Sequence, residues 1–199
     1  SENSKLRQRI AAFIEAQSGN SELEEEIELL GRWDGGTAKD NRSAALVLLT
    51  DRTRSNSSRG SRGHEQTLEQ LRQAAADLRK HFGRIDPEWG DVNRLVRGDK
   101  DLPLGGGPDT LRAIYGRPRE DGILAGRAGD CFFQFVEWDR DGKLRAWAIN
   151  QFGSSPGNPD SPHHTDQAPL FADEKLRNVP FTREEVLAAA KRTYRPVEQ

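Results

Sequence analysis

The sequence predicts an α+β protein whose first half is helical and whose second half contains a β-hairpin and a closing helix. In the first half, apolar residues recur three and four positions apart, which is the period of an amphipathic helix. In the second half, residues 129–152 read as two apolar strands joined by a tight turn. We therefore expect a helical segment over residues 1–98 and a hairpin region over residues 99–199.

Five stretches carry the helical prediction. Residues 6–14 and 65–82 have apolar positions on one face, and residues 21–24 have the form of a capping box that starts a further helix. The apolar run at 44–50 favours helix because Ala and Leu dominate it, and residues 91–97 suggest a short helix. The sequence thus predicts that helices account for most of the ordered structure before residue 98.

The hairpin is expected to be buried on both faces. The first strand of the hairpin begins near Cys131, and the return strand spans residues 144–152. Between them, residues 139–142 form a tight turn, in which Gly142 can adopt the positive φ that such a turn requires. Neither face of the first strand is polar, so other protein should cover both sides. Cys131 is interpreted as a small core residue. Such a hairpin needs a large partner structure.

The closing helix has a well-defined start. Thr182 and Glu185 have the spacing of a capping box, and Phe181 and Val186 have that of a hydrophobic staple. By contrast, residues 52–63 are polar, glycine-rich and basic, which predicts a mobile surface loop, with a basic anion-binding arm as the alternative interpretation.

Composition excludes several classes of protein. The net charge of -2 gives no basic footprint for nucleic acid, and no apolar run is long enough to span a membrane. The single cysteine excludes an internal disulfide. A chain of 199 residues fits one globular domain, but its 34% hydrophobic content is low against the usual ~45–50% on a count that includes Gly. This indicates either long solvated stretches or a piece of a larger body.

Gly153–Gly157 matches the G-x-S-x-G pattern of a serine nucleophile, with Ser155 at its centre. That pattern needs a helix directly after the serine, whereas prolines and glycines follow here. Asp160 and His163 would also have to complete a triad within eight residues of Ser155. We interpret the segment as a loop.

Two further clusters could suggest ligands. His163, His164 and Asp166 could bind a metal, but neighbouring histidines point apart and no further ligand cluster is evident. We expect them to satisfy the loop's main chain, and we predict no metal and no cofactor. The glycines at 105–107 lack the Lys and Ser/Thr of a phosphate loop, so they predict close backbone packing or a bend. Residues 109–115 then fit either a helical turn or an irregular strand.

Several motifs in the second half occur in a fixed order, as follows: Leu102–Pro108 (LPLGGGP), Gly129–Asp130, Gln151–Ser155 (QFGSS), Asn158–Gln167 (NPDSPHHTDQ), Pro180–Phe181 and Glu184–Val186. Together they resemble the penicillin acylase family of N-terminal-nucleophile (Ntn) hydrolases, nearest to its acyl-homoserine-lactone and aculeacin acylase branch. The family-signature loop comprises Asn158, Pro159, Ser161, Pro162, His163, Asp166 and Gln167. The resemblance covers about the last half of the chain and implies a portion of the αββα layered Ntn fold.

The resemblance also implies a function and partners. It places this chain at the carboxyl-terminal end of a large β subunit, with the α subunit and the earlier part of the β subunit as partners and a small acyl amide as substrate. Export to the periplasm or outside is implied in the same way. The nucleophilic serine and oxyanion donors are expected outside this chain. Ser1 is a poor candidate, since Glu2, Asn3 and an amphipathic helix follow it.

Two alternatives stay open at this stage. One is a freestanding, non-catalytic interaction domain, which would melt cooperatively on its own. The other is a small serine hydrolase that uses Ser155. The portion of an acylase is the interpretation we favour.

Overall fold

The computed structural model describes residues 4–17, 19, 21–52, 64–108, 110 and 112–193, and the chain forms two compact units. Unit 1 is Ser1–Asp130 and unit 2 is Cys131–Gln199. Helices and mixed sheets are both present, so the α+β prediction is confirmed. The loop predicted at 52–63, apart from the main chain of Arg52, and the candidate nucleophile Ser1 lie outside the described residues. Residues 98 and 99, where we divided the chain, lie in a turn of unit 1.

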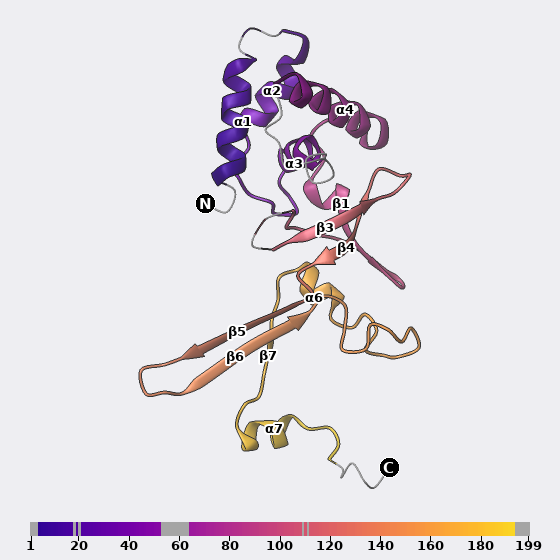
Figure 1. Cartoon of the computed structure of the whole chain (residues 1–199). Helices are drawn as coiled ribbons and strands as arrows, with labels where there is room; N and C mark the ends of the chain where they lie inside the picture. The colour runs from indigo at the N-terminus through magenta and orange to yellow at the C-terminus, as the bar shows by residue number, and fades with distance from the viewer. Residues whose placement is uncertain are drawn as a thin grey trace. The chain divides into compact units, whose positions relative to one another are not determined.

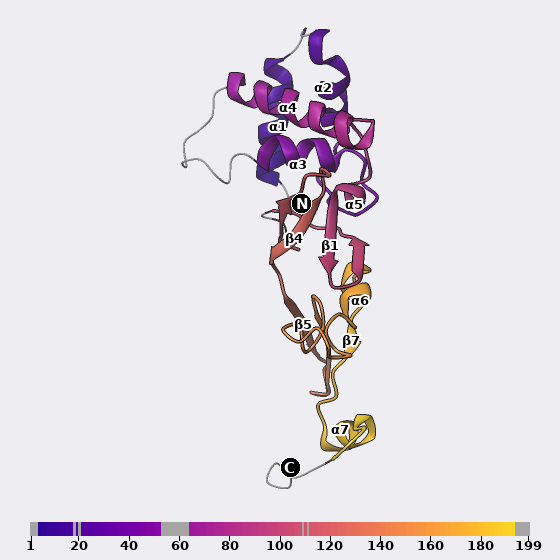
Figure 2. The same cartoon turned by 90° about the vertical axis from the view of Figure 1, so that its right-hand side faces the viewer.

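The helices of unit 1 gather around α3, as Figures 1 and 2 show. Every residue of α3 from Ala44 to Leu48 is buried, so this first part of the helix is apolar all round and occupies the centre of the core. The helical elements are α1 (Ser4–Ala16), the 3-10 turn η1 (Ser21–Leu23), α2 (Glu24–Gly31), α3 (Ala44–Arg52), α4 (His64–Phe82) and α5 (Trp89–Val92). The helices predicted at 6–14, 44–50 and 65–82 are therefore confirmed.

Two local predictions in unit 1 are wrong. The capping box at 21–24 does not form, because α2 begins after Leu23 without a side-chain cap; three Glu residues in its first turn stabilise that end instead. Residues 91–97 are not a helix, because from Asn93 onward they form a strand. The strand is held by antiparallel pairing with the next strand, across a two-residue turn at 98–99, and by parallel pairing with a more distant strand near residue 124.

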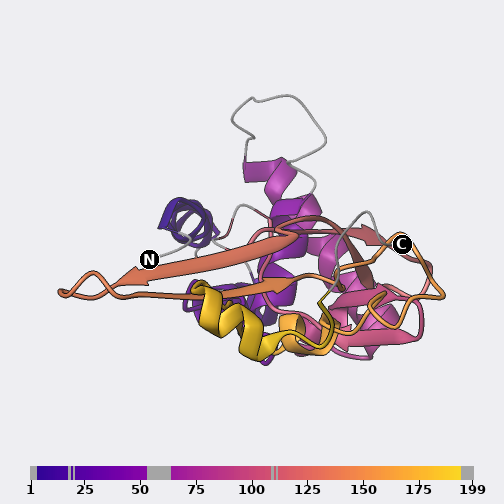
Figure 3. The same ribbon diagram turned by 90° about the horizontal axis from the view of Figure 1, so that it is seen from below.

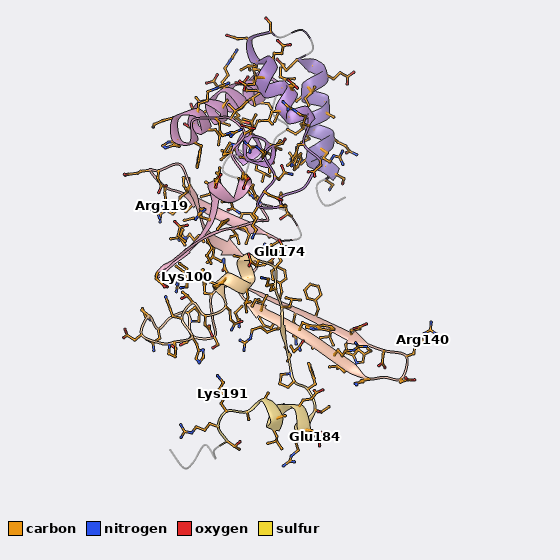
Figure 4. All side chains as sticks on the ribbon, turned by 180° about the vertical axis from the view of Figure 1, so that it is seen from behind. Lys100, Arg119, Arg140, Glu174, Glu184 and Lys191 are labelled. Atoms are coloured by element: carbon orange, nitrogen blue, oxygen red, sulfur yellow. The ribbon has the colours of Figure 1, made fainter. Side chains whose placement is uncertain are left out.

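The strands of unit 1 form a sheet in the order β2-β1-β4-β3. They are β1 (Asn93–Arg97), β2 (Lys100–Pro103), β3 (Ile114–Pro118) and β4 (Leu124–Gly129). β1 pairs antiparallel with β2 and parallel with β4, while β3 and β4 are antiparallel with a bulge between Tyr115 and Gly116. Figure 4 labels Lys100 at the turn between β1 and β2. Of the alternatives left open for 109–115, the described part supports the strand, which begins at Ile114.

Unit 2 is built on the predicted hairpin, whose strands run side by side as a long ribbon in Figure 3. Its strands are β5 (Phe132–Trp138), β6 (Leu144–Asn150) and the short β7 (Arg177–Asn178), in the order β5-β6-β7. Arg140 marks the tip of the hairpin in Figure 4. Two short helices, α6 (Ala168–Ala172) and α7 (Arg183–Ala189), complete the unit. The return strand ends at Asn150, two residues before the predicted position.

Two expectations for unit 2 have different outcomes. Cys131 is exposed, so its assignment to the core is wrong: it lies just before β5, where the unit packs little against it. The capping box of the closing helix is confirmed, with the Glu185 N–H donating to Thr182 Oγ1 at 3.1 Å and the Thr182 N–H donating to Glu185 Oε2 at 3.1 Å. No described helix is long and apolar enough to cross a membrane.

Candidate functional site

The family-signature loop connects β6 to α6 and is closed by Gln167. The side chain of Gln167 is buried, and its Oε1 accepts the Asn150 N–H at 3.0 Å. Its own N–H donates to the Phe152 carbonyl at 2.8 Å. Gln167 therefore satisfies the main chain at the end of β6 and ties the end of the loop to its beginning.

Gly153 allows the two sides of the loop to touch. A Cβ at this position would lie well inside 3.0 Å of the His163 carbonyl oxygen and 2.6 Å from Asp166 Oδ1. The same His163 carbonyl accepts the Ser155 N–H at 3.1 Å. The glycine is thus required by close backbone approach.

The polar residues between these points make local turns. Asn158 Oδ1 accepts the Asp160 N–H at 3.1 Å, and Ser161 Oγ accepts the His163 N–H at 3.2 Å. Side chains that accept from a main-chain N–H two residues on are typical of Asx and Ser turns. Pro159 and Pro162 are exposed and each follows one of these turn-forming residues. The motif therefore encodes the path of the loop.

The structure does not assemble a triad around Ser155. His163 Nδ1 lies 2.9 Å from Asp166 Oδ2, and both side chains are accessible, at 59% and 32% exposure. Asp160, the acid that a triad would use, donates its main-chain N–H within the Asn158 turn. Turns rather than a helix follow Ser155, so the segment is a loop, as we expected.

Two polar atoms in this part of unit 2 are buried without a hydrogen-bond partner: Gln151 Nε2 and His164 Nδ1. Leaving a buried polar group unpaired costs about 1–3 kcal/mol, so each marks a place where a further partner would stabilise the loop. Among the described residues, no group of three or more His, Cys, Asp and Glu side chains is placed to hold a metal ion.

The glycine motif of unit 1, Leu102–Pro108, forms hydrogen bonds with neighbouring segments through its main chain. The Gly106 N–H donates to the Thr37 carbonyl at 2.8 Å, and the Gly106 carbonyl accepts Trp89 Nε1–H at 2.6 Å. The buried Asn93 donates its Nδ2–H to the Leu104 carbonyl at 2.9 Å. Gly106 has φ +82° and lies against the Arg112 carbonyl oxygen. These groups are turned into the protein, so the motif packs closely, as predicted, and does not form a phosphate cradle.

The Gly129–Asp130 pair holds the start of β3. Gly129 has φ +122° and approaches the Ala113 carbonyl too closely for a side chain. Asp130 Oδ2 accepts the Ala113 N–H at 2.8 Å, and the Asp130 N–H donates to the Ala113 carbonyl at 2.8 Å. Gly129 therefore permits the close approach of the two segments, and Asp130 holds the main chain of Ala113.

A groove of 650 Å³ lies between α2 and α4, lined mainly by glutamates and by Arg72 and Arg79. Arg79 bonds Glu26 at 2.7 Å and Glu25 at 2.7 Å, and Glu26 is buried. The hydrogen bond with Glu26 raises the pKa of Arg79, against the opposing effect of burial. Arg72 also bonds Glu22 at 2.7 Å, so ion pairs from both arginines of α4 cross the groove to η1 and α2.

Sequence reasoning did not find the roles of Trp89 and Asn93. Both side chains bond the glycine motif from positions 11 to 17 residues earlier in the chain. No local pattern distinguishes them from ordinary core residues.

With this geometry in place, comparison with known proteins identifies the class: the α+β arrangement is a portion of an Ntn-hydrolase fold. A sequence model of the family described as penicillin amidase matches residues 2–188. The chain therefore belongs to the penicillin amidase family.

Curated relatives agree with this assignment. The acyl-homoserine lactone acylase PvdQ of Pseudomonas fluorescens strain Pf0-1 is 32% identical over 127 residues, which cover 62% of this chain and 16% of the relative. The protein of the same name from strain Pf-5 is 30% identical over 117 residues, covering 57% of this chain and 15% of the relative. That from Pseudomonas savastanoi pv. phaseolicola is 29% identical over 112 residues, covering 52% and 14%. The matched part is thus a small share of each relative.

Proposed function

We propose that this chain is the carboxyl-terminal portion of the β subunit of an amidohydrolase that cleaves the bond between an acyl chain and an amine. One observation carries the proposal: the family match extends over residues 2–188, yet the chain aligns with only 14–16% of the curated relatives' lengths. The relatives' names support an acyl-homoserine lactone as substrate. A lipopeptide or the side chain of a β-lactam has the same kind of amide.

The chain itself is proposed to be catalytically silent. In the larger enzyme, an amino-terminal serine would attack the carbonyl while its own α-amine takes the proton, and amide donors would hold the oxyanion. Support comes from the signature loop, where His163 faces Asp166 and Gln167 binds the main chain. These contacts brace the loop and do not activate a nucleophile.

The partners follow from the same proposal. They are the α subunit and the earlier part of the β subunit, which would carry the nucleophile and the acyl pocket. We propose export to the periplasm or outside the cell, no cofactor, and no nucleic-acid partner.

Labelling of the protein purified from its native source tests this proposal. A serine-directed phosphonate, followed by peptide mapping, should modify a serine outside this chain, and hydrolysis of an N-acyl-homoserine lactone should stop with labelling. Ser155→Ala should leave the rate unchanged. Labelling of Ser155 would instead support the small serine hydrolase, and the absence of both labelling and amide hydrolysis would contradict an acylase.

A freestanding interaction domain is the second candidate. It is favoured by the core of unit 1, which buries most of α3 and large side chains such as Trp89 and Leu30 within the unit. In that case, the chain purified alone would be monomeric and would melt in one cooperative transition. A portion of a larger enzyme would instead expose the hairpin and aggregate.

A further inference from the structure

β5 is the outermost strand of the unit 2 sheet, and alternate residues of β5 turn their main-chain groups away from β6. The Cys131 carbonyl accepts the Gln151 N–H at 2.9 Å, and the Asp139 N–H donates to the Lys143 carbonyl at 3.0 Å. In an antiparallel ladder, this phase makes the odd-numbered residues of β5 bond to β6. The N–H and C=O groups facing out of the sheet are then those of Phe132, Gln134, Val136 and Trp138.

Large apolar side chains flank this free edge on both faces of the hairpin. Phe132 and Trp138 share one face and are 51% and 64% exposed. Phe135 projects from the opposite face and is 55% exposed. Three of the seven residues of β5 thus expose more than half of a large aromatic side chain beside this edge.

The edge lacks the features that normally protect such strands. β5 contains no proline, glycine or lysine, its only charge is Glu137, and its register with β6 is continuous without a bulge. The buried apolar side chains of unit 2 are few among the described residues, as follows: Ala146, Ile149, Ala168, Phe171 and Ala172. The unit therefore has little core of its own to stabilise a hairpin of this length.

We propose that the free edge of β5 accepts a β-strand from the remainder of the acylase, whose body also covers both faces of the hairpin. This inference rests on the proposed function, because it takes its partner from the larger enzyme. The added strand is an extended segment of about seven residues with apolar side chains on both faces. Its main chain would bond the outward groups of β5, as in other cases of strand addition.

A second copy of this chain fits the surface less well. Edge-to-edge pairing of two hairpins would satisfy the main chain of β5, but the new sheet would keep Phe135 and Trp138 on open faces. A larger body covers the edge and both faces together. The relatives described above are long enough to supply one, since this chain aligns with only 14–16% of their lengths.

Hydrogen exchange resolved to single amides, measured on the intact native protein, tests the proposal. The inward amides of Phe133, Phe135 and Glu137 bond to β6 in any case and serve as controls within the same strand. In the intact protein, the outward amides of Gln134 and Val136 should exchange at least about tenfold slower than in the 199-residue chain alone. Fast outward amides beside slow inward ones in the intact protein would overturn the proposal.

A matched pair of variants sharpens the test. Val136→Pro removes an outward N–H that β6 does not use, and proline is tolerated at such edge positions. Val136→Ala keeps that N–H. In the intact protein, we expect the proline variant alone to lose the slow exchange at Gln134; equal exchange in both variants would count against strand addition.

The remaining outcomes separate this proposal from the proposed function. If the outward amides of the chain alone exchange more slowly as the protein concentration is raised, the edge pairs with a second copy. That result would overturn the partner named here. Slow exchange in an intact protein that hydrolyses no acyl amide would leave the strand addition standing while the proposed function fails. An intact protein that hydrolyses acyl amides but has fast-exchanging outward amides would support the proposed function and overturn the strand addition.

Discussion

The substitution Gly106→Ala tests whether the glycine motif of unit 1 is required for close packing of the main chain. Gly106 has φ +82°, and a Cβ would lie well inside 3.0 Å of the Arg112 carbonyl oxygen. That oxygen also accepts Thr110 Oγ1–H at 2.7 Å and the Gly107 N–H at 3.1 Å. The added methyl group must therefore displace a carbonyl that two donors hold in place.

The expected cost can be worked from these contacts. A non-glycine residue in the left-handed region costs about 1–2 kcal/mol. Moving the Arg112 carbonyl weakens two hydrogen bonds, each with a net value of about 0.5–1.5 kcal/mol. We therefore expect Gly106→Ala to lower the free energy of unfolding by about 2–5 kcal/mol, a large share of the ~5–15 kcal/mol of a typical domain.

Gly107→Ala is the matched control from the same motif. No positive φ applies at Gly107, and its Cβ would meet Leu48 Cδ1 at 3.3 Å, which a small shift of a flexible side chain relieves. We expect a loss below about 1 kcal/mol. Urea unfolding of the 199-residue chain, at protein concentrations low enough to keep exposed hairpins from associating, can be followed by the helical circular dichroism signal. That signal reports on unit 1, because the longest described helices and the core around them lie in this unit.

Two results would refute the reasoning. Equal losses for Gly106→Ala and Gly107→Ala would show that close approach at Gly106 is not what the motif provides. A rise in the unfolding midpoint with added inorganic phosphate, abolished by either variant, would restore the phosphate-loop interpretation.

Three other changes have expected outcomes. Gly153→Ala should raise the proteolysis rate within the signature loop several-fold, because its Cβ meets main chain, whereas Gly157→Ala meets no atom within 4 Å and should leave the rate unchanged. Asn93→Leu should cost about 1–3 kcal/mol in urea unfolding, since buried carbonyls lose their donor; a cost near zero would contradict that role. The hydrogen bond from Arg84 lowers the pKa of Asp86 from its ordinary value of 3.8, so the ion pair stabilises the fold above that value and the contribution is lost as pH falls through the lowered pKa. Asp86→Asn should flatten the acid limb of the stability curve below about pH 4, and an unchanged acid limb would contradict this.

Local patterns in the sequence were sufficient for most helices and for the hairpin. The apolar spacing at 65–82, the Ala and Leu content of 44–50 and the Thr182–Glu185 spacing each act within one element. Such signals do not depend on distant parts of the chain, so the elements that they predict are also found in the folded protein.

The sheet of unit 1 could not be predicted in the same way. β1 gains its strand conformation from β2 on one side and from the parallel β4, about thirty residues later, on the other. Asn93 and Trp89 reach the glycine motif across 11 and 17 residues. Strand pairing of this kind is decided by tertiary contacts, which explains the wrong helix at 91–97.

The signature loop was predicted in kind but not in detail. Its composition indicated an ordered turn-rich loop, and the structure assigns individual contacts to Asn158, Ser161 and Gln167. The partners of Gln167 depend on where β6 ends, which the sequence placed two residues too late. Contacts with the rest of a larger enzyme are expected to complete the surroundings of the loop.

The central claim is that this chain is a catalytically silent portion of a larger amidohydrolase. Intact mass under denaturing conditions, measured beside native mass on protein from the natural source, tests it most directly. The account predicts that the sequence of this chain occurs in, or travels with, a much larger assembly that carries an amino-terminal serine and hydrolyses acyl amides. A monomer of 22.3 kDa that folds cooperatively alone and has no acylase partner would contradict the account.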